Sequence, residues 1–286
     1  MRKYNMRSKY MIKFYARCVI LLGVFAMYFF GYKGIDVLYG WNFFHEFSLL
    51  HILWLLWVID MIQQLIPAKG VLSLGSQKQF LLHFVPSNLR KTTAELKQFV
   101  AEQNFIIIKV GLVWIALILA ISLLFQFNVL EPKHCLIFVV LFYVSDLICV
   151  LFWCPFRVFL MKNRCCATCR IFNWDHLMMF SPAVFCMGFY TWSLFIMSVA
   201  VFLVWEIYFF SHPERFWEET NDALKCVNCQ EFLCGKNLHY VGMTNIEDVA
   251  LKKAADLKDG ITEKVGETAN SIKEEISEKI DDIKRK

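Results

Sequence analysis

The sequence lacks the signatures of the common soluble enzymes, since it has no P-loop, no GxSxG or HExxH motif and no dinucleotide-binding fingerprint. It also lacks the alternating apolar and polar pattern of barrel strands. No acidic residue occurs in its first 17 positions, and no small-x-small cleavage site follows the first apolar run. These absences exclude a soluble catalytic domain and a cleaved signal peptide, and they favour a protein that is not an enzyme.

Apolar residues are present in excess. They make up 58% of the 286 residues, and 28 of them are Phe. Several runs approach or exceed the roughly 20 residues that a helix needs to span a bilayer. Backbone polar groups must be satisfied within lipid, so these runs are expected to be helices. The sequence therefore predicts an all-α integral membrane protein in contact with the lipid bilayer.

The order of the runs predicts a membrane domain over residues 18–210, preceded by a basic cytoplasmic segment, 1–17. A small Cys/His segment, 211–244, and a charged amphipathic helical tail, 245–286, follow it. The predicted spans are about 16–35, 47–66, 105–126, 135–160 and 179–210.

Basic residues divide the connecting segments into two classes. The segments 1–17, 67–104 and 155–177 carry 6, 5 and 4 Lys and Arg, whereas the remaining short loops carry only Lys33 and Lys133. Cytoplasmic loops of membrane proteins are enriched in these residues. We therefore predict a multi-pass protein of the cell membrane with a cytoplasmic N-terminus and, after five spans, a C-terminus outside. The basic excess sits around the spans and does not indicate binding to nucleic acid.

Three charged residues fall within the predicted spans. Charge in lipid is costly and usually faces a partner or a water path. Asp60 and Lys109 lie at similar depth, which favours a structural pair. Asp146 has no evident charged partner, so we expect a neutral carboxyl group or a site for a proton or cation.

The first cysteine cluster lies between the last two predicted spans. Cys166-x-x-Cys169 can chelate a metal or close a disulfide, and Cys165 and Cys154 are further candidate ligands. Four thiolates suit zinc or, second, an iron–sulfur cluster. Adjacent cysteines such as Cys165 and Cys166 rarely ligate one ion together, so redox-active, lipidated and structural thiols remain alternatives.

The second cluster has the spacing C-x2-C-x4-C-x4-H, formed by Cys226, Cys229, Cys234 and His239. It resembles the zinc knuckle over 14 residues, but there the third and fourth ligands are His and then Cys. Gln230 also stands where that family has glycine. The resemblance implies zinc as a cofactor at these four residues. A disulfide with one spare thiol is the alternative.

A shared site of Cys166, Cys169, Cys226 and Cys229 requires residues 178–210 to re-enter, at Pro182 or Gly188. A single long span would separate the two pairs, so separate sites are expected. Four further cysteines are isolated in apolar runs and are interpreted as buried small hydrophobes: Cys18, Cys135, Cys149 and Cys186.

Three functions remain open. The favoured one is a non-enzymatic membrane protein whose cysteines form a metal or structural thiol site. The second is a membrane-anchored interaction or scaffold protein. Its tail, 245–286, repeats apolar residues every 11 positions, which suits a protein partner or a membrane surface. The third is a small transporter organised on Asp146, or a membrane thiol-redox protein.

Overall fold

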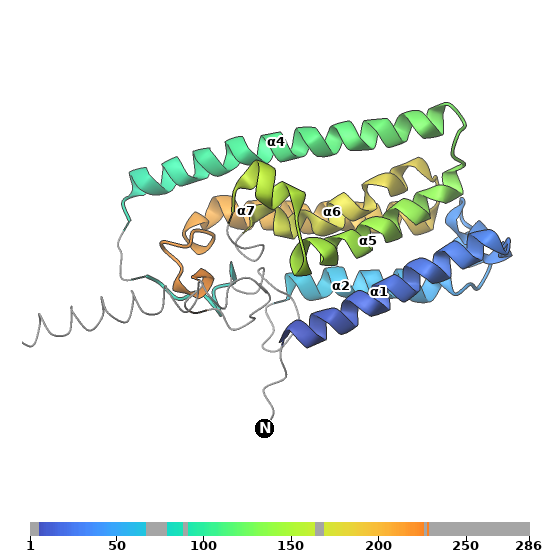
Figure 1. The fold of residues 1–286 in the computed structure, drawn as a ribbon, viewed down its shortest axis with the longest axis horizontal. Helices are drawn as coiled ribbons and strands as arrows, with labels where there is room; N and C mark the ends of the chain where they lie inside the picture. The colour runs from blue at the N-terminus through green and yellow to red at the C-terminus, as the bar shows by residue number, and fades with distance from the viewer. Residues whose placement is uncertain (1–5, 67–78, 88–90, 164–168, 226–227, 229–286) are drawn as a thin grey trace, which may run out of the picture. The chain divides into compact units, whose positions relative to one another are not determined.

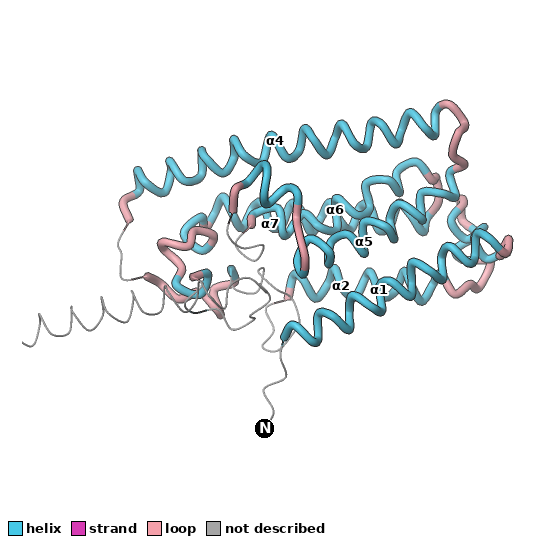
Figure 2. Tube along the Cα trace, viewed as in Figure 1, coloured by secondary structure: helices cyan, strands magenta, loops and turns pink. Residues whose placement is uncertain are grey.

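The computed structural model describes residues 6–66, 79–87, 91–163, 169–225 and 228, and throughout these it contains helices, two isolated bridges and no strand. Long helices lie side by side along one bundle, with loops at its two ends (Figures 1 and 2). They are α1 (Met6–Phe29), α2 (Leu50–Leu65), α4 (Thr93–Gln126), α5 (Cys135–Leu151) and α7 (Phe189–Ser211). The expected all-helical fold is confirmed.

By length and composition, four segments of the described chain can cross a membrane, rather than the five expected. They are Arg7–Phe29, Thr93–Gln126, Pro132–Leu151 and Phe189–Ser211. Helix α2 is also apolar, but its 16 residues are fewer than the roughly 20 that a helix needs to span a bilayer. The chain divides into two units, Met1–Cys234 and Gly235–Lys286, and the second lies outside the described residues. The predictions for the 11-residue repeat of the tail therefore also lie outside them.

The predicted span 179–210 is not one helix, and this is the main correction to the expected fold. The chain advances instead through three short pieces, η6 (Arg170–Trp174), α6 (Asp175–Phe180) and η7 (Ser181–Phe185), and then turns into α7. Gly188 lies in that turn, against the loop that follows α1. A Cβ added to it would lie 1.9 Å from the Leu38 carbonyl oxygen. Residues 170–211 thus form a hairpin of one broken and one continuous limb.

One end of the bundle, called here the opposite end, gathers the loops 30–49, 127–134 and 181–188. Gly40 pairs with Gly188 in a parallel bridge, and the Phe125 and Phe185 rings stack at 5.2 Å. The other end, called here the basic end, holds the start of α1 and the segments 79–87, 152–163 and 212–225. There Pro86 pairs with Asn221 in an antiparallel bridge. Helix α7 therefore ends at the end where α1 begins, which the five-span topology did not predict.

Three helices also differ from expectation in their boundaries, and the first, α1, runs over Met6–Phe29 rather than 16–35. Helix α4 runs for 34 residues, about 51 Å at 1.5 Å per residue, and joins a predicted surface helix to the third span. It begins at a capping box, in which the Thr92 hydroxyl accepts the Glu95 N–H and the Glu95 carboxylate accepts the Thr92 N–H. Helix α5 ends at Leu151, and a π-helical turn, Phe156–Met161, follows the break.

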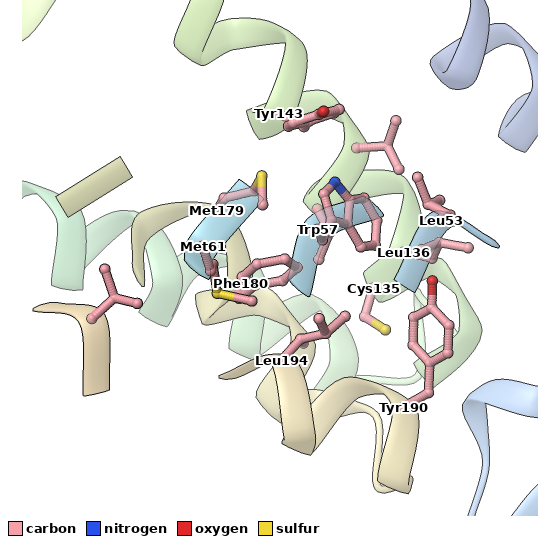
Figure 3. Packing of buried hydrophobic residues seen from close by; sticks show 14 of the residues in the cluster. Leu53, Trp57, Met61, Cys135, Leu136, Tyr143, Met179, Phe180, Tyr190 and Leu194 are labelled. Atoms are coloured by element: carbon pink, nitrogen blue, oxygen red, sulfur yellow. The ribbon is translucent and has the colours of Figure 1, made fainter. Parts of the chain in front are cut away.

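The core lies where α2, α5, α6 and α7 meet. Trp57 of α2 is fully buried and packs edge-on against Phe180 and Tyr143, beside Met61 and Leu194 (Figure 3). Large apolar side chains also point outward along the helices, such as Val19 at 67% exposure and Leu112 at 61%. Outward apolar faces of this extent are typical of proteins that contact lipid or a partner.

Candidate functional site: a charged cluster inside the bundle

Arg17 lies at the middle of α1 and joins three helices. Its Nη1 donates to the Asp146 carboxylate at 2.7 Å and to the Tyr143 carbonyl oxygen at 2.6 Å, both in α5. Its Nη2 lies 3.8 Å from the Asp60 carboxylate in α2. The guanidinium also stacks on the Tyr143 ring, 3.8 Å from the centroid. These contacts tie α1 to α2 and α5.

His176 connects the charged side chains around Arg17 to α6, in the broken limb of the hairpin. Its Nε2 lies 3.7 Å from the Asp60 carboxylate and its Nδ1 lies 3.0 Å from the Asp175 carboxylate. Asp175 also accepts the His176 backbone N–H at 2.8 Å and the Gln64 amide at 3.0 Å. An imidazole between two carboxylates can donate from both nitrogens only when it is protonated. The arrangement therefore favours the imidazolium form of His176.

The balance of charge depends on a single proton. The carboxylates of Asp60 and Asp146 face the permanent cation of Arg17, and a third carboxylate, that of Asp175, faces His176. Lys13, one helical turn before Arg17, acts electrostatically on Asp60. With His176 protonated these charges cancel, and without that proton the cluster carries one negative charge in excess. The cluster can thus gain or lose a proton at a position between four elements, α1, α2, α5 and α6.

A second buried ion pair lies nearer the basic end. Arg170 of η6 donates to Glu206 of α7 at 2.5 Å and to the Asn104 side-chain oxygen of α4 at 2.6 Å. The Trp174 indole donates to the same Glu206 at 2.8 Å, and the Phe209 ring lies 3.5 Å from the Arg170 guanidinium carbon. These contacts tie the first turn of the broken limb to two long helices. They fix the residues that precede His176.

Two expectations about intramembrane charge are wrong. Asp60 pairs with Arg17 and His176 rather than with Lys109, whose Nζ lies 4.1 Å from the Phe105 ring centroid on α4. Asp146, expected to lack a charged partner, has Arg17 at 2.7 Å. Sequence reasoning missed Arg17 because it assigned residues 1–17 to a cytoplasmic segment. Starting α1 at Met6 puts Arg17 at mid-helix, so a helix-boundary signal could have found it.

The candidate metal ligands fall mostly outside the described residues. This holds for Cys165, Cys166, Cys226, Cys229, Cys234 and His239. Cys154 and Cys169 are described and buried, and Cys169 donates to the Met161 sulfur at 3.0 Å. Within the described part of the chain, no group of three His, Cys, Asp or Glu residues could hold a metal ion.

Cys149, interpreted from sequence as an isolated small hydrophobe, shares a hydrogen bond with Cys154. The re-entry that a shared four-thiolate site requires is present at Pro182 and Gly188. The Cys166, Cys226 and Cys229 thiols of such a site lie outside the described residues.

Comparison of the chain with protein-family models, with curated proteins and with solved structures finds no match.

Proposed function

We propose that this chain is a small membrane transporter that binds a proton at the cluster of Arg17, Asp60, Asp146, Asp175 and His176. One observation carries the proposal: the charged cluster lies where the last membrane segment is broken into short helices. Non-helical backbone at membrane depth is tolerated where protein buries it or where it lines a cavity. In secondary transporters, discontinuous helices of this kind line the binding sites for substrate and coupling ion.

The energetic argument supports a functional role as well. Ionisable residues within membrane segments are costly and are usually retained for ion or proton binding. A purely structural bridge needs one cation and one anion, whereas this cluster joins three carboxylates through Arg17 and His176. The side chains of Asp60 and Asp146 also keep 24% and 25% of their surface open, so protein does not enclose them completely.

The orientation that fits this function places the basic end in the cytoplasm. In the described residues, the segments of the basic end carry seven Lys and Arg, namely Arg7, Lys9, Lys13, Arg157, Lys162, Arg215 and Lys225. The loops of the opposite end carry two, Lys33 and Lys133. The positive-inside rule then puts both the start of α1 and the end of α7 on the cytoplasmic side.

Flux through reconstituted vesicles tests the transport proposal. Purified protein is placed in vesicles that contain a pH-sensitive dye, with potassium and valinomycin to clamp the potential, and a proton or sodium gradient is applied. We expect ion entry above that of empty vesicles. It should fall to the empty-vesicle rate in Asp146→Asn and in His176→Gln. Lys109→Gln is the matched control, since Lys109 lies on α4 over Phe105, and it should keep the flux. Wild-type flux equal to that of empty vesicles under both gradients would overturn the proposal.

The cysteine segments support a second proposal, a thiol-bound metal, with zinc preferred. The spacing of the cysteines in the sequence supports it, and two of the candidate ligands, Cys154 and Cys169, are buried in the structure. Metal analysis and thiol counting on anaerobically purified protein test it. Absence of zinc and iron at stoichiometric level, with all 11 thiols reactive, would remove it.

A further inference from the structure

Buried amide side chains lie on the side of the charged cluster that faces the basic end. Gln64 lies one helical turn after Asp60 in α2, and its Nε2 donates to the Asp175 carboxylate at 3.0 Å. The Asn173 Nδ2 donates to the Gln79 side-chain oxygen at 2.9 Å. All three amide residues are at most 5% exposed. Because Gln64 is in the last turn of α2 and Gln79 starts a segment of the basic end, these amides lead from the cluster to that end.

Two of these amides keep an unused oxygen. The Gln64 Nε2 points at a carboxylate, and an ionised carboxylate can only accept, so the other atom of the amide, Oε1, is left for a different donor. Within the described residues, the Gln64 Oε1 and the Asn173 Oδ1 are buried without a hydrogen-bond partner. Buried polar atoms in folded proteins are nearly always bonded to protein or to ordered water. Two such acceptors beside a charged cluster therefore indicate bound water.

Unpaired donors are buried in the same part of the bundle. The Arg170 Nε in η6 and the Trp205 Nε1 in α7 lack a partner in the part of the chain that the structure describes. The Trp205 ring lies 5.1 Å from the ring of Phe80, which follows Gln79 in the chain. Arg170 also bonds Glu206, the neighbour of Trp205. A buried water needs roughly two to four polar partners, and these adjoining elements supply two acceptors and two donors.

The other side of the cluster offers water no comparable site. There Trp57 packs edge-on against Phe180 and Tyr143, beside Met61 (Figure 3). Its indole N–H is also unpaired among the described residues, but it is a single donor inside the hydrophobic core, which gives a water too few partners. Apolar packing thus closes the cluster towards the opposite end, whereas polar side chains link it to the basic end.

We propose that Gln64 and Asn173 hold water molecules that connect the charged cluster to the cytoplasm, and that the cluster exchanges its proton by this route in this conformation. The Gln64 amide is the first step, because it bonds the Asp175 carboxylate, which in turn contacts the His176 imidazole. A proton that leaves His176 passes to a water held at these oxygens, and that water releases a proton to the cytoplasm.

The inference rests on the proposed proton site and on the orientation given above. Its tests measure access of water rather than flux. Failure of the flux experiment would therefore leave them informative, and their failure would leave the transport proposal intact.

Matched cysteines on α2 test the route. Gln64→Cys and Met61→Cys are about one turn apart at positions that are at most 5% exposed, but only the first replaces a side chain of the proposed route. Both lie in residues 34–69, a tryptic peptide without a native cysteine. Inside-out vesicles are loaded with free cysteine, which destroys reagent that crosses the bilayer, and are treated with aminoethyl methanethiosulfonate.

Mass spectrometry of this peptide gives the rate of modification at each position. Position 64 should react at least about tenfold faster than position 61, because only a thiolate reacts and apolar surroundings suppress it. Equal rates at the two positions would overturn the proposal. Faster modification of position 64 in right-side-out vesicles than in inside-out ones would overturn it as well.

The unaltered protein gives a second measurement that does not depend on the variants folding. Hydroxyl radicals produced in water by X-rays oxidise buried side chains that touch bound water. Trp205 and Trp57 are a matched native pair, since both are at most 2% exposed and both have an unpaired indole N–H in the structure as described. Trp205 should be oxidised several-fold faster than Trp57 when the digested peptides are measured by mass spectrometry. Equal oxidation of the two would overturn the proposal.

Discussion

The two halves of the bundle are stabilised by different interactions. Towards the basic end, buried charges from separate elements satisfy one another, as in the contacts of Arg17 with Asp146 and of Arg170 with Glu206. Towards the opposite end, aromatic rings take over. Phe43 packs against Trp54, Phe189 and Tyr190 at centroid distances of 5.0–6.2 Å. The first half requires exact pairing of charge, whereas the second requires only that large apolar surfaces fit.

This difference accounts for the position of the broken limb. A continuous helix satisfies its own backbone but offers fixed side-chain directions. The short pieces η6 and α6 let seven residues reach three different partners. Arg170 and Trp174 contact Glu206 of α7. Asp175 contacts Gln64 and His176 contacts Asp60, both in α2. At the opposite end the limb needs only to turn, and Pro182 and Gly188 suffice for that. The charged half therefore holds the candidate for function, and the aromatic half holds the scaffold.

Accessibility labelling tests whether the two ends face different compartments, and the expected effect is all or none. Single cysteines replace exposed Val129, at the opposite end, and exposed Asn228, after α7, in a background without native cysteines. An impermeant maleimide applied to intact cells should label position 129 and not position 228. Permeabilised cells should label both, which controls for reactivity. Labelling of position 228 from outside would restore the five-span topology and contradict the proposed orientation.

Removing the central cation should cause the largest loss of stability in the charged half. Arg17→Met leaves Asp146 and Asp60 without their guanidinium partner, and breaking a buried ion pair from one side costs about 3–5 kcal/mol. Thermal unfolding in detergent should report this as a marked fall in midpoint. Lys109→Met, which removes a charge of the same sign at a site without a carboxylate partner in the structure as described, is the control. Equal midpoints for the two variants would contradict the pairing.

Much of this fold could be predicted from sequence, because helix formation in lipid is dictated by composition. The apolar runs predicted both ends of α2, the start of α5 and the end of α4 to within three residues. They missed the two ends of α1 by ten and six residues and the end of α5 by nine. The run 179–210 was wrongly predicted as a single span. Phe, Met and Leu continue on both sides of Pro182, so hydropathy alone indicates one long helix. Proline and glycine at positions 182 and 188 were the local signals of the turn.

The candidate site could be predicted only in part. Asp60 and Asp146 stood out because acids are rare in apolar runs. Their partners did not stand out, because Arg17 was counted as the last residue of the basic segment 1–17 and His176 lay in a loop-like stretch. Pairing between helices depends on rotation about each helix axis and on register between helices, and neither is encoded in a local pattern.

A smaller effect is expected from filling space at the turn of the aromatic half. Gly188→Ala would place a Cβ 1.9 Å from the Leu38 carbonyl oxygen, so the backbone must shift. Overpacking of this kind costs about 1–3 kcal/mol. Gly23→Ala is the matched control, because an added Cβ there meets nothing within 4 Å and α1 gains a better helix former. The midpoint should fall in the first variant and stay or rise in the second. A fall of equal size in both would show that the close approach at Gly188 is absent.

The smallest effect is expected from an ion pair that water reaches. Glu131 and Lys133 form a salt bridge in the exposed loop before α5, and this bond lowers the pKa of the Glu131 carboxyl group from its ordinary value of 4.5. A lowered pKa in the folded state stabilises the fold above about pH 4.5, and this contribution disappears as the pH falls through the lower folded value. Exposed pairs contribute little. Glu131→Gln should therefore unfold within measurement error of the parent at pH 7, and the two curves should converge fully in acid. A loss at neutral pH as large as that of Arg17→Met would mean that burial does not separate the two kinds of pair. The contrast drawn between the two halves would then fail.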